Sequence, residues 1–229
     1  MTGSFNEYKD TYGDEVQHSI RFVRQSHDFF TESKARHLVA LTERHLGPTE
    51  GLTALDVGCG VGVTDRLIAP RFKEVHGVDV AEDVVERAAA ENPDVAYRTY
   101  DGTALPYADG TFDVVFAICV LHHVDVATRG AFVAEMKRVA RHPGLVMIFE
   151  HNPINPLTRL AVARCDFDED VVLLTRREVA SLSRRAGLSV VDARYILFLP
   201  WMIELSQKLD RVLGRLPLGA QHVTVAATT

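Results

Sequence analysis

Cysteine, tryptophan and long apolar runs are scarce in this chain of 229 residues, which has three cysteines and one tryptophan. Cys59, Cys119 and Cys165 form no C-x-x-C pair, so their spacing argues against a zinc ribbon or a disulfide scaffold. No apolar run reaches the roughly 20 residues that span a membrane, and the polar, acidic residues 1–15 do not resemble a signal peptide. These absences predict a cytoplasmic protein with reduced thiols and no membrane partner.

An excess of positive charge is also absent, because 25 lysines and arginines face 31 aspartates and glutamates, a net charge of -6. The chain has little with which to neutralise phosphates, so we expect no nucleic-acid partner. The acidic stretch 166–170 lacks the spacing of a calcium loop, and we expect no metal. A hydrophobic content of 47% suffices for one sizeable core, in a monomer or a homodimer.

Apolar runs typical of strands alternate with helical patterns from residue 52 onward. This alternation predicts an α/β fold with a doubly wound, mostly parallel sheet. Thr175 and Glu178 have the spacing of a capping box, which predicts a helix over 175–186. The expected strands are 52–57, 74–79, 95–100, 112–119, 145–150, 188–199 and 222–227, and the other expected helices are 63–70, 81–91, 128–141 and 202–216.

Two segments fall outside this alternation. Helical periodicity over 19–30 and 31–46 predicts an N-terminal helical lid at residues 1–47, followed by the main domain at 48–229. The prolines and mixed charges of residues 151–174 predict an inserted substrate lid within that domain. We expect the lid over the acceptor to draw on the aromatic and imidazole side chains Tyr8, Tyr12, His18 and His27.

A glycine-rich loop follows the first expected strand, with Gly58, Gly60 and Gly62 at alternate positions and a helix directly after. Glycines let the backbone turn tightly and approach a ligand closely, and the helix begins with free N–H groups. The G-x-G-x-x-G fingerprint of nicotinamide cofactors would need a glycine at Val63. The spacing therefore makes a nicotinamide cofactor the second choice.

Together with Asp56 and Cys59, this loop resembles the cofactor loop of class I S-adenosylmethionine-dependent methyltransferases. The resemblance implies a seven-stranded, Rossmann-like fold, S-adenosyl-L-methionine as cofactor and S-adenosyl-L-homocysteine as product. It also implies that the glycine loop cradles the methionine part, that Asp79 binds the ribose hydroxyls and that Asp101 accepts from the adenine amino group. The expected cofactor-binding residues are Asp56, Gly58, Cys59, Gly60, Gly62, Asp79, Val80, Asp101, Gly102 and Ile118.

Two pairs of ionisable residues follow the fourth and fifth expected strands, His122 with His123 and Glu150 with His151. These residues resemble the acid/base positions of small-molecule, including sugar, O-methyltransferases. A histidine can take a hydroxyl proton near neutral pH, and we expect His123, helped by His122 and Glu150, to do so. The alternative is that the imidazoles only pack beneath the cofactor.

The segment from Asn152 to Arg159 contains two Asn-Pro pairs. Proline restricts the preceding residue, and we expect the amides to recognise hydroxyl groups of the acceptor. The predicted function is O-methylation of a sugar or a secondary metabolite. A cofactor-binding module or a cyclase with the same fold is the alternative, and a NAD-dependent dehydrogenase ranks after it.

Overall fold

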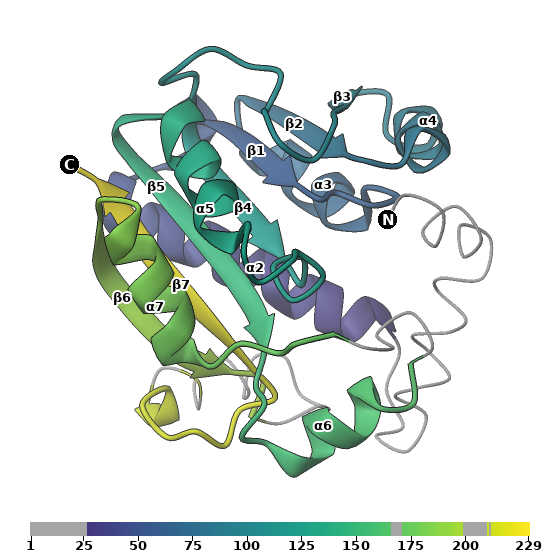
Figure 1. The fold of residues 1–229 in the computed structure, drawn as a ribbon. Coiled ribbons are helices and arrows are strands. Elements are labelled where there is room, and N and C mark those ends of the chain that lie inside the picture. Colours follow the sequence, from purple (N-terminus) through teal and green to yellow (C-terminus); the bar gives the residue numbers. More distant parts are fainter. Residues whose placement is uncertain (1–26, 166–170, 199–209, 211) are drawn as a thin grey trace.

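A seven-stranded sheet in the order β3-β2-β1-β4-β5-β7-β6 forms the centre of the protein, with helices on both faces (Figure 1). The computed structural model describes residues 27–165, 171–198, 210 and 212–229. The strands are β1 (Thr53–Val57), β2 (Glu74–Asp79), β3 (Ala96–Thr99), β4 (Phe112–Ile118), β5 (Ala140–His151), β6 (Leu188–Ile196) and β7 (Gln221–Thr228). The helices are α2 (His27–Leu46), α3 (Val63–Ile68), α4 (Glu82–Glu91), α5 (Arg129–Val139), α6 (Pro156–Val162) and α7 (Arg176–Arg185), with the short 3-10 turns η3 (Thr49–Gly51) and η4 (Ala69–Arg71).

Strands β1 to β5 run parallel, whereas β7 pairs antiparallel with both β5 and β6. This arrangement confirms the predicted doubly wound, mostly parallel seven-stranded sheet. The chain winds from β1 outward to β3 and then returns to the other side of β1 at β4. Ligands of open α/β sheets bind at such a switch point, outside the carboxyl ends of the strands. The fold therefore directs attention to the loops after β1 and β4.

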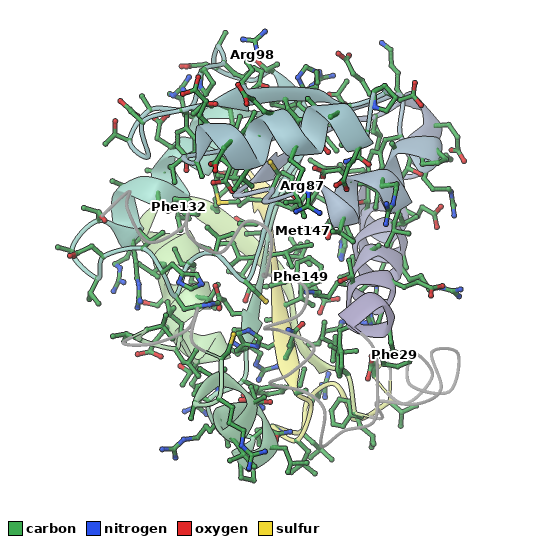
Figure 2. All side chains as sticks on the ribbon, turned by 90° about the vertical axis from the view of Figure 1, so that its right-hand side faces the viewer. Phe29, Arg87, Arg98, Phe132, Met147 and Phe149 are labelled. Atoms are coloured by element: carbon green, nitrogen blue, oxygen red, sulfur yellow. The ribbon has the colours of Figure 1, made fainter. Side chains whose placement is uncertain are left out.

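Apolar side chains fill both faces of the sheet. Residues of α5 and α7 pack on one face, where Met136 and Val179 are fully buried. On the other face Leu38 of α2 and Ile68 of α3 pack with Met147 and Phe149 of β5. Figure 2 labels these two β5 residues. Strand β4 is buried along almost its whole length, as expected for a parallel strand covered on both faces.

The predicted helix over 175–186 is confirmed by α7, whose N-cap Thr175 and Glu178 form the reciprocal capping box. Two other boundaries differ from the prediction. The helical break at residue 30 is absent, because no glycine or proline interrupts α2 between His27 and Leu46. Strand β5 begins at Ala140 rather than 145 and includes Pro143 and Gly144, since Ala140 still pairs with Phe112 of β4.

The segment predicted as a second lid contains the helix α6, which lies beyond the end of β5 (Figure 1). Its start follows from the sequence, because Asn155 caps the helix and Pro156 occupies the first turn. The lid candidates Tyr8, Tyr12 and His18, the side chain of His27 and most of the expected helix 202–216 lie outside the described residues. Among the helices of the described ranges, none is long and apolar enough to cross a bilayer.

Candidate active site

The loops that follow β1 and β4 lie against each other at the switch point of the sheet. A Cβ atom added at Gly58 would lie 2.5 Å from the Val120 side chain, so only glycine permits this close approach. Cys119, between the end of β4 and Val120, has a positive φ of 58°. This backbone conformation is unfavourable for any residue other than glycine. The two loops form one continuous rim at the carboxyl ends of the strands.

The glycine loop is held by the carboxylate of Asp79 at the end of β2. The Gly60 N–H donates to Asp79 Oδ2 at 3.0 Å, and the Ala81 N–H donates to Oδ1 at 3.1 Å. Burial raises the pKa of Asp79, whereas these backbone N–H groups lower it. Asp79 therefore couples the loop after β1 to the loop after β2, which is the relationship expected if both bind one ligand.

The space around each glycine tests whether the loop fits S-adenosylmethionine. All three glycines have positive φ angles, 83° at Gly58, 53° at Gly60 and 72° at Gly62. A Cβ at Gly62 would lie 2.2 Å from the Tyr97 hydroxyl, whereas a Cβ at Gly60 would meet no atom of the described residues within 4 Å. Gly58 and Gly62 thus pack into the protein, and Gly60 borders open space where a ligand backbone contact is possible. The residues present fit a loop that cradles a ligand.

Carboxyl groups predominate beneath and beside this loop. Asp56, at 3% exposure, and Asp65, at 0%, are buried under it, and Asp79 borders it. Burial raises the pKa of all three carboxyl groups, so each of them is ionised less readily than an exposed aspartate.

Asp101 and its neighbours occupy the loop after β3. Asp101 Oδ1 accepts hydrogen bonds from the N–H and hydroxyl of Thr103 and from the Ala104 N–H, at 2.7 to 3.0 Å. The Thr103 hydroxyl and these N–H groups lower the pKa of the exposed Asp101 to about 2. Gly102, with φ of 80°, lies beside Val80, 3.4 Å from its Cγ1 if a Cβ is added. The structure thus brings Val80, Asp101 and Gly102 to one side of the rim.

A buried histidine–carboxylate pair lies at the ends of β4 and β5. His122 Nδ1 lies 2.6 Å from Glu150 Oε2, and the His122 backbone N–H donates to Oε1 at 3.3 Å. Burial opposes ionisation of Glu150, yet the positive charge and hydrogen bond of His122 outweigh it and lower the pKa of the carboxyl. Glu150 is therefore an ionised acceptor, so His122 Nδ1 carries the proton of this hydrogen bond and Nε2 is the remaining ring nitrogen.

His123 and His151 surround this pair. The ring centroid of His122 lies 4.2 Å from that of His123 and 5.2 Å from that of His151. Both outer histidines are partly exposed, whereas His122 and Glu150 are buried. All four predicted acid/base residues thus meet in one cluster, with the carboxylate oriented toward His122 rather than His123.

Gln221, the first residue of β7, adds an amide that the sequence did not indicate. It pairs with His151 across β5 and β7, and its Nε2 lies 3.4 Å from His151 Nδ1 and 3.5 Å from Cys119 Sγ. The residue is 5% exposed, and its Oε1 has no hydrogen-bond partner among the described residues. An unsatisfied buried carbonyl oxygen is costly and calls for a donor.

Arg129 is a second residue that sequence reasoning missed. Its guanidinium donates to the carbonyl oxygens of Val124, His122 and Val172, at 3.0, 3.2 and 2.8 Å. The side chain is buried, at the start of α5. Arg129 thus connects the loop after β4, which carries His122, to the segment that precedes α7. These contacts hold the backbone at His122 in place.

The expectation that the amides of the Asn-Pro pairs bind the acceptor is wrong. Asn152 is buried and its Nδ2 donates to the carbonyls of Pro217 and Gly219. Asn155 caps α6 through Oδ1 and donates to the Leu218 carbonyl. The N–H donors of both amides bind carbonyl oxygens of the segment before β7 and so hold α6 against that segment. They are therefore not available to a ligand.

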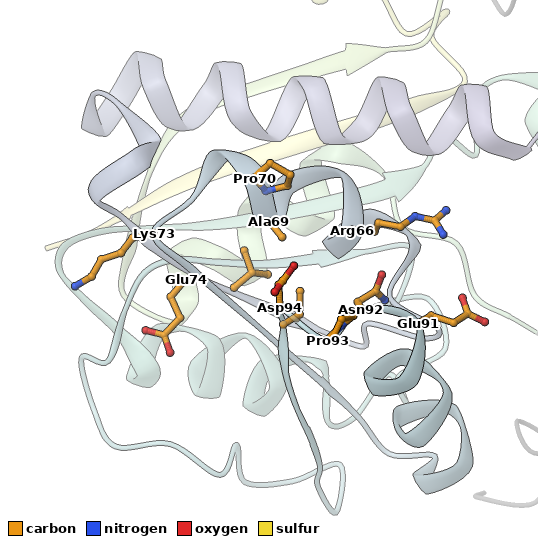
Figure 3. Close-up of a pocket in the computed structure, with 11 residues that line it drawn as sticks. Arg66, Ala69, Pro70, Lys73, Glu74, Glu91, Asn92, Pro93 and Asp94 are labelled. Carbon is orange, nitrogen blue, oxygen red and sulfur yellow. The ribbon is translucent and has the colours of Figure 1, made fainter.

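A separate cavity of about 440 Å³ lies beside the amino ends of β2 and β3, away from the glycine loop's open side (Figure 3). Its lining has mixed charge and includes Arg66, Lys73, Glu74, Glu91 and Asp94. None of the predicted site residues is among the described residues that line it. The predicted residues instead gather at the carboxyl ends of β1 to β5, with Ile118 as the last residue of β4.

Known proteins share this organisation. A family model described as a methyltransferase domain matches residues 55–148. A ubiquinone biosynthesis O-methyltransferase of Cereibacter sphaeroides is 31% identical over 177 residues, which cover 70% of each chain. A 2-methyl-6-phytyl-1,4-hydroquinone methyltransferase of Synechocystis is 33% identical over 106 residues, or 44% of this chain and 33% of that protein. The chain spans between 33% and 49% of the length of this and two further curated relatives.

The fold also matches solved structures. A protein of Thermotoga maritima, titled a SAM-dependent methyltransferase and possible histamine N-methyltransferase, matches with a TM-score of 0.69 and 18% identity. The match covers 100% of both chains. At this identity the likeness establishes the arrangement of strands and helices.

Proposed function

Because the chain belongs to the class I S-adenosylmethionine-dependent methyltransferases, we propose that it methylates a hydroxyl group of a small molecule. The acceptor class that we favour is a sugar or a secondary metabolite. The observation that carries the proposal is the contact between His122 and Glu150 at the rim beside the glycine loop. A hydroxyl is a weak nucleophile until a base takes its proton, and this pair supplies an oriented base.

The cofactor residues in this proposal are those gathered around the glycine loop. Bound S-adenosylmethionine supplies an electrophilic methyl group on a sulfonium. The loop from Gly58 to Gly62 would hold the methionine part, Asp79 the ribose hydroxyls, and Asp101 the adenine amino group through Oδ2. Oδ1 of Asp101 already accepts three bonds from its own loop.

His122 is the residue that we assign as the base. Glu150 fixes its tautomer and orientation and stabilises the positive charge that the imidazole gains on taking a proton, which is the role of the third group in catalytic triads. Arg129 holds the His122 carbonyl and so limits movement of the loop. His123 packs against the His122 ring and is the second candidate, since it is more exposed.

Gln221 supports the choice of a hydroxyl-bearing acceptor. Its Oε1, which has no donor within the described part of the chain, accepts hydrogen bonds only, and its Nε2 already faces His151 and Cys119. A ligand that donates a hydrogen bond from a second hydroxyl would satisfy this oxygen. Sugars and polyhydroxylated aromatic metabolites carry such neighbouring hydroxyls.

The proposal is tested by incubating the protein with labelled S-adenosylmethionine and a panel of glycosides, phenols and amines, with products identified by mass. We expect one methyl group added to a hydroxyl-bearing compound. His122→Gln should lower kcat by roughly 10²–10⁴ with cofactor affinity unchanged, the usual contribution of one acid–base group. His123→Gln is the matched comparison. Turnover that depends on His123 alone would move the base to that residue, and methylation of amines only would contradict the proposed acceptor class.

A further inference from the structure

Two segments beyond the end of β5 form an exposed apolar surface, which we call the platform. They are residues 152–165, which contain α6, and residues 212–220, which precede β7. Both lie at the same end of the molecule (Figure 1). Of the ten large apolar side chains that are exposed in the described residues, six belong to the platform, with exposures of 41–78%: Ile154, Leu157, Leu160, Val212, Leu216 and Leu218. Such a concentration of exposed apolar side chains marks an interaction surface.

The helix α6 presents its apolar side outward. Leu157 and Leu160, three residues apart, lie on the same side of the helix and are 59% and 41% exposed. Thr158 is buried instead, and its hydroxyl donates to the Ala220 carbonyl at 2.8 Å. A surface helix ordinarily buries its apolar side and exposes its polar one. The reversed orientation is therefore expected of a helix that contacts an apolar partner.

The backbone N–H groups at the start of α6 need no water, because the two Asn-Pro pairs satisfy them. Asn155 Oδ1 accepts from the N–H groups of Leu157 and Thr158, at 2.9 and 3.3 Å. Asn152 Oδ1 accepts from the Ile154 N–H at 3.0 Å. The prolines of the two pairs have no N–H to satisfy. The Asn-Pro pairs thus build a backbone that can leave water at little cost.

The carbonyl oxygens of the second segment are satisfied in the same way. Asn152, Asn155 and Thr158 donate through their side chains to the carbonyls of all four residues 217–220, at 2.7 to 3.1 Å. Carbonyl groups of an exposed loop can bind water, so pairing within the protein is not required there. In an apolar surrounding it is required, because each unsatisfied group costs several kcal/mol. The platform therefore has the hydrogen bonding of a surface that enters a medium of low polarity.

The charge of the platform differs from that of the whole chain. Residues 152–165 and 212–220 contain three arginines and no aspartate or glutamate, whereas the chain has a net charge of -6. Two of these arginines, Arg159 and Arg215, are exposed and have no ion-pair partner in the described ranges. The acidic stretch 166–170 lies outside those ranges. The platform thus combines exposed leucines with exposed positive charge.

This combination decides between two kinds of partner. In a two-fold contact between copies of the chain, each platform would face an identical one, and the arginines would meet like charges without a carboxylate to pair with. An anionic lipid surface offers phosphates to arginine and an apolar boundary to leucine. The sequence predicted no membrane partner because it lacks a spanning run, but a protein that lies on a membrane needs no such run.

We propose that the platform docks the protein on an anionic lipid surface. The leucines enter the boundary between headgroups and acyl chains, and Arg159 and Arg215 contact the phosphates. Asn152 directly follows His151, and Ala220 directly precedes Gln221, so the docked platform brings the acid/base cluster close to that surface. The inference does not require the proposed function, because docking is measured without cofactor or methyl acceptor.

Flotation of the full chain with lipid vesicles tests the proposal. One set of vesicles contains phosphatidylcholine alone, and the other contains phosphatidylcholine mixed with anionic phosphatidylglycerol. We expect stronger binding to the mixed vesicles, and weaker binding as salt screens the arginines. Leu157→Gln/Leu218→Gln should lower the partition coefficient by roughly tenfold or more, since burying one leucine side chain contributes about this factor.

Two further variants separate the apolar and electrostatic contributions. Arg159→Gln/Arg215→Gln should bind both sets of vesicles equally, because it removes the attraction to phosphatidylglycerol. Leu67→Gln is the matched control, since Leu67 is an exposed leucine of α3 outside the platform, and it should float as the parent protein does. All the substituted side chains are exposed, and thermal unfolding checks that each variant keeps the stability of the parent.

Failure of the parent protein to float with the mixed vesicles would overturn the inference, as would undiminished flotation of Leu157→Gln/Leu218→Gln. An unchanged preference for phosphatidylglycerol in Arg159→Gln/Arg215→Gln would also contradict it. Sedimentation equilibrium without lipid tests the other partner. A dimer that dissociates in Leu157→Gln/Leu218→Gln would assign the platform to a second copy of the chain and overturn lipid docking. None of these outcomes bears on methyl transfer, which is assayed separately.

Discussion

The imidazole of His122 lies within hydrogen-bond distance of the Glu150 carboxylate, at 2.6 Å, and both side chains are almost completely buried. The two residues are 28 positions apart and meet because β4 and β5 are parallel neighbours that end at the same edge of the sheet. A buried carboxylate that keeps a low pKa needs a cationic or donating partner. The pair therefore combines a fixed tautomer with stabilisation of a protonated imidazole.

Replacing the carboxylate while keeping its shape tests this role. Glu150→Gln should lower kcat by roughly 10²–10⁴ and leave the affinity for S-adenosylmethionine unchanged, because the amide no longer stabilises a positive imidazole. The double variant with His122→Gln should be little worse than either single variant, since the residues act as a unit. Steady-state kinetics and calorimetry of the three variants check this, and additive losses would show that the residues act independently.

Substitutions at the glycines of the loop distinguish an effect on cofactor binding from an effect on protein stability. Gly60→Val should abolish cofactor binding with only a modest loss of stability, because the added side chain enters the open space at the rim. Gly62→Ala should instead lower the melting temperature, since its Cβ would collide with the Tyr97 hydroxyl. Gly47→Val controls for the backbone cost alone, since Gly47 has a φ of 94° and a Cβ there would have no atom of residues 27–165, 171–198, 210 and 212–229 within 4 Å. Normal affinity in Gly60→Val would reduce the loop to a structural turn.

Asp79 is expected to contribute to cofactor binding directly and through the loop. Asp79→Ala should cost roughly 1.5–3 kcal/mol of binding free energy, the range for hydrogen bonds to a charged group. It also removes the acceptor of the Gly60 N–H. Glu82→Ala, an exposed carboxylate three residues on, should leave the dissociation constant unchanged. Equal affinities of the two variants in calorimetry would remove Asp79 from the site.

The carboxyl group of Asp65, buried beneath the glycine loop, should also make the stability of the protein depend on pH. The folded-state pKa of Asp65, about 7, lies above its unfolded value, so the folded protein binds more protons between pH 4 and 7. The free energy of unfolding attributable to Asp65 therefore decreases as the pH rises through this window. Asp65→Asn should raise the stability relative to the parent more at pH 8 than at pH 5, by an amount on the order of a few kcal/mol. Denaturant unfolding at the two pH values checks the sign, and a larger gain at pH 5 would contradict it.

Local patterns predicted the strands and the capped helix well, because each depends on residues close in sequence. The run from Phe112 is apolar except for Asp113 and became the buried strand β4, and Thr175 with Glu178 became a capping box. The positions of Asp56, Asp79, His122 and Glu150 at strand ends followed from the same alternation of strands and helices. Their convergence was predictable once the strands were taken as parallel.

Contacts across the fold were not predictable in this way. Gln221 reaches His151 only because β7 turns antiparallel beside β5, and no local pattern marks a single glutamine. Arg129 contacts carbonyls on both sides of the histidine loop, whereas the sequence places it only in a helix. Asn152 and Asn155 had the composition of a binding loop, yet the segment before β7 occupies their amides. Tertiary packing decided these roles.

The central claim is tested most directly by the atom that receives the methyl group. The protein is incubated with ¹³C-methyl S-adenosylmethionine and each compound of the hydroxyl-bearing panel, and the labelled product is examined by ¹³C NMR. The account predicts a methyl carbon bonded to oxygen, formed by the parent protein and nearly absent with His122→Gln at saturating cofactor. A methyl carbon bonded to nitrogen or carbon, or undiminished transfer by His122→Gln, would contradict it.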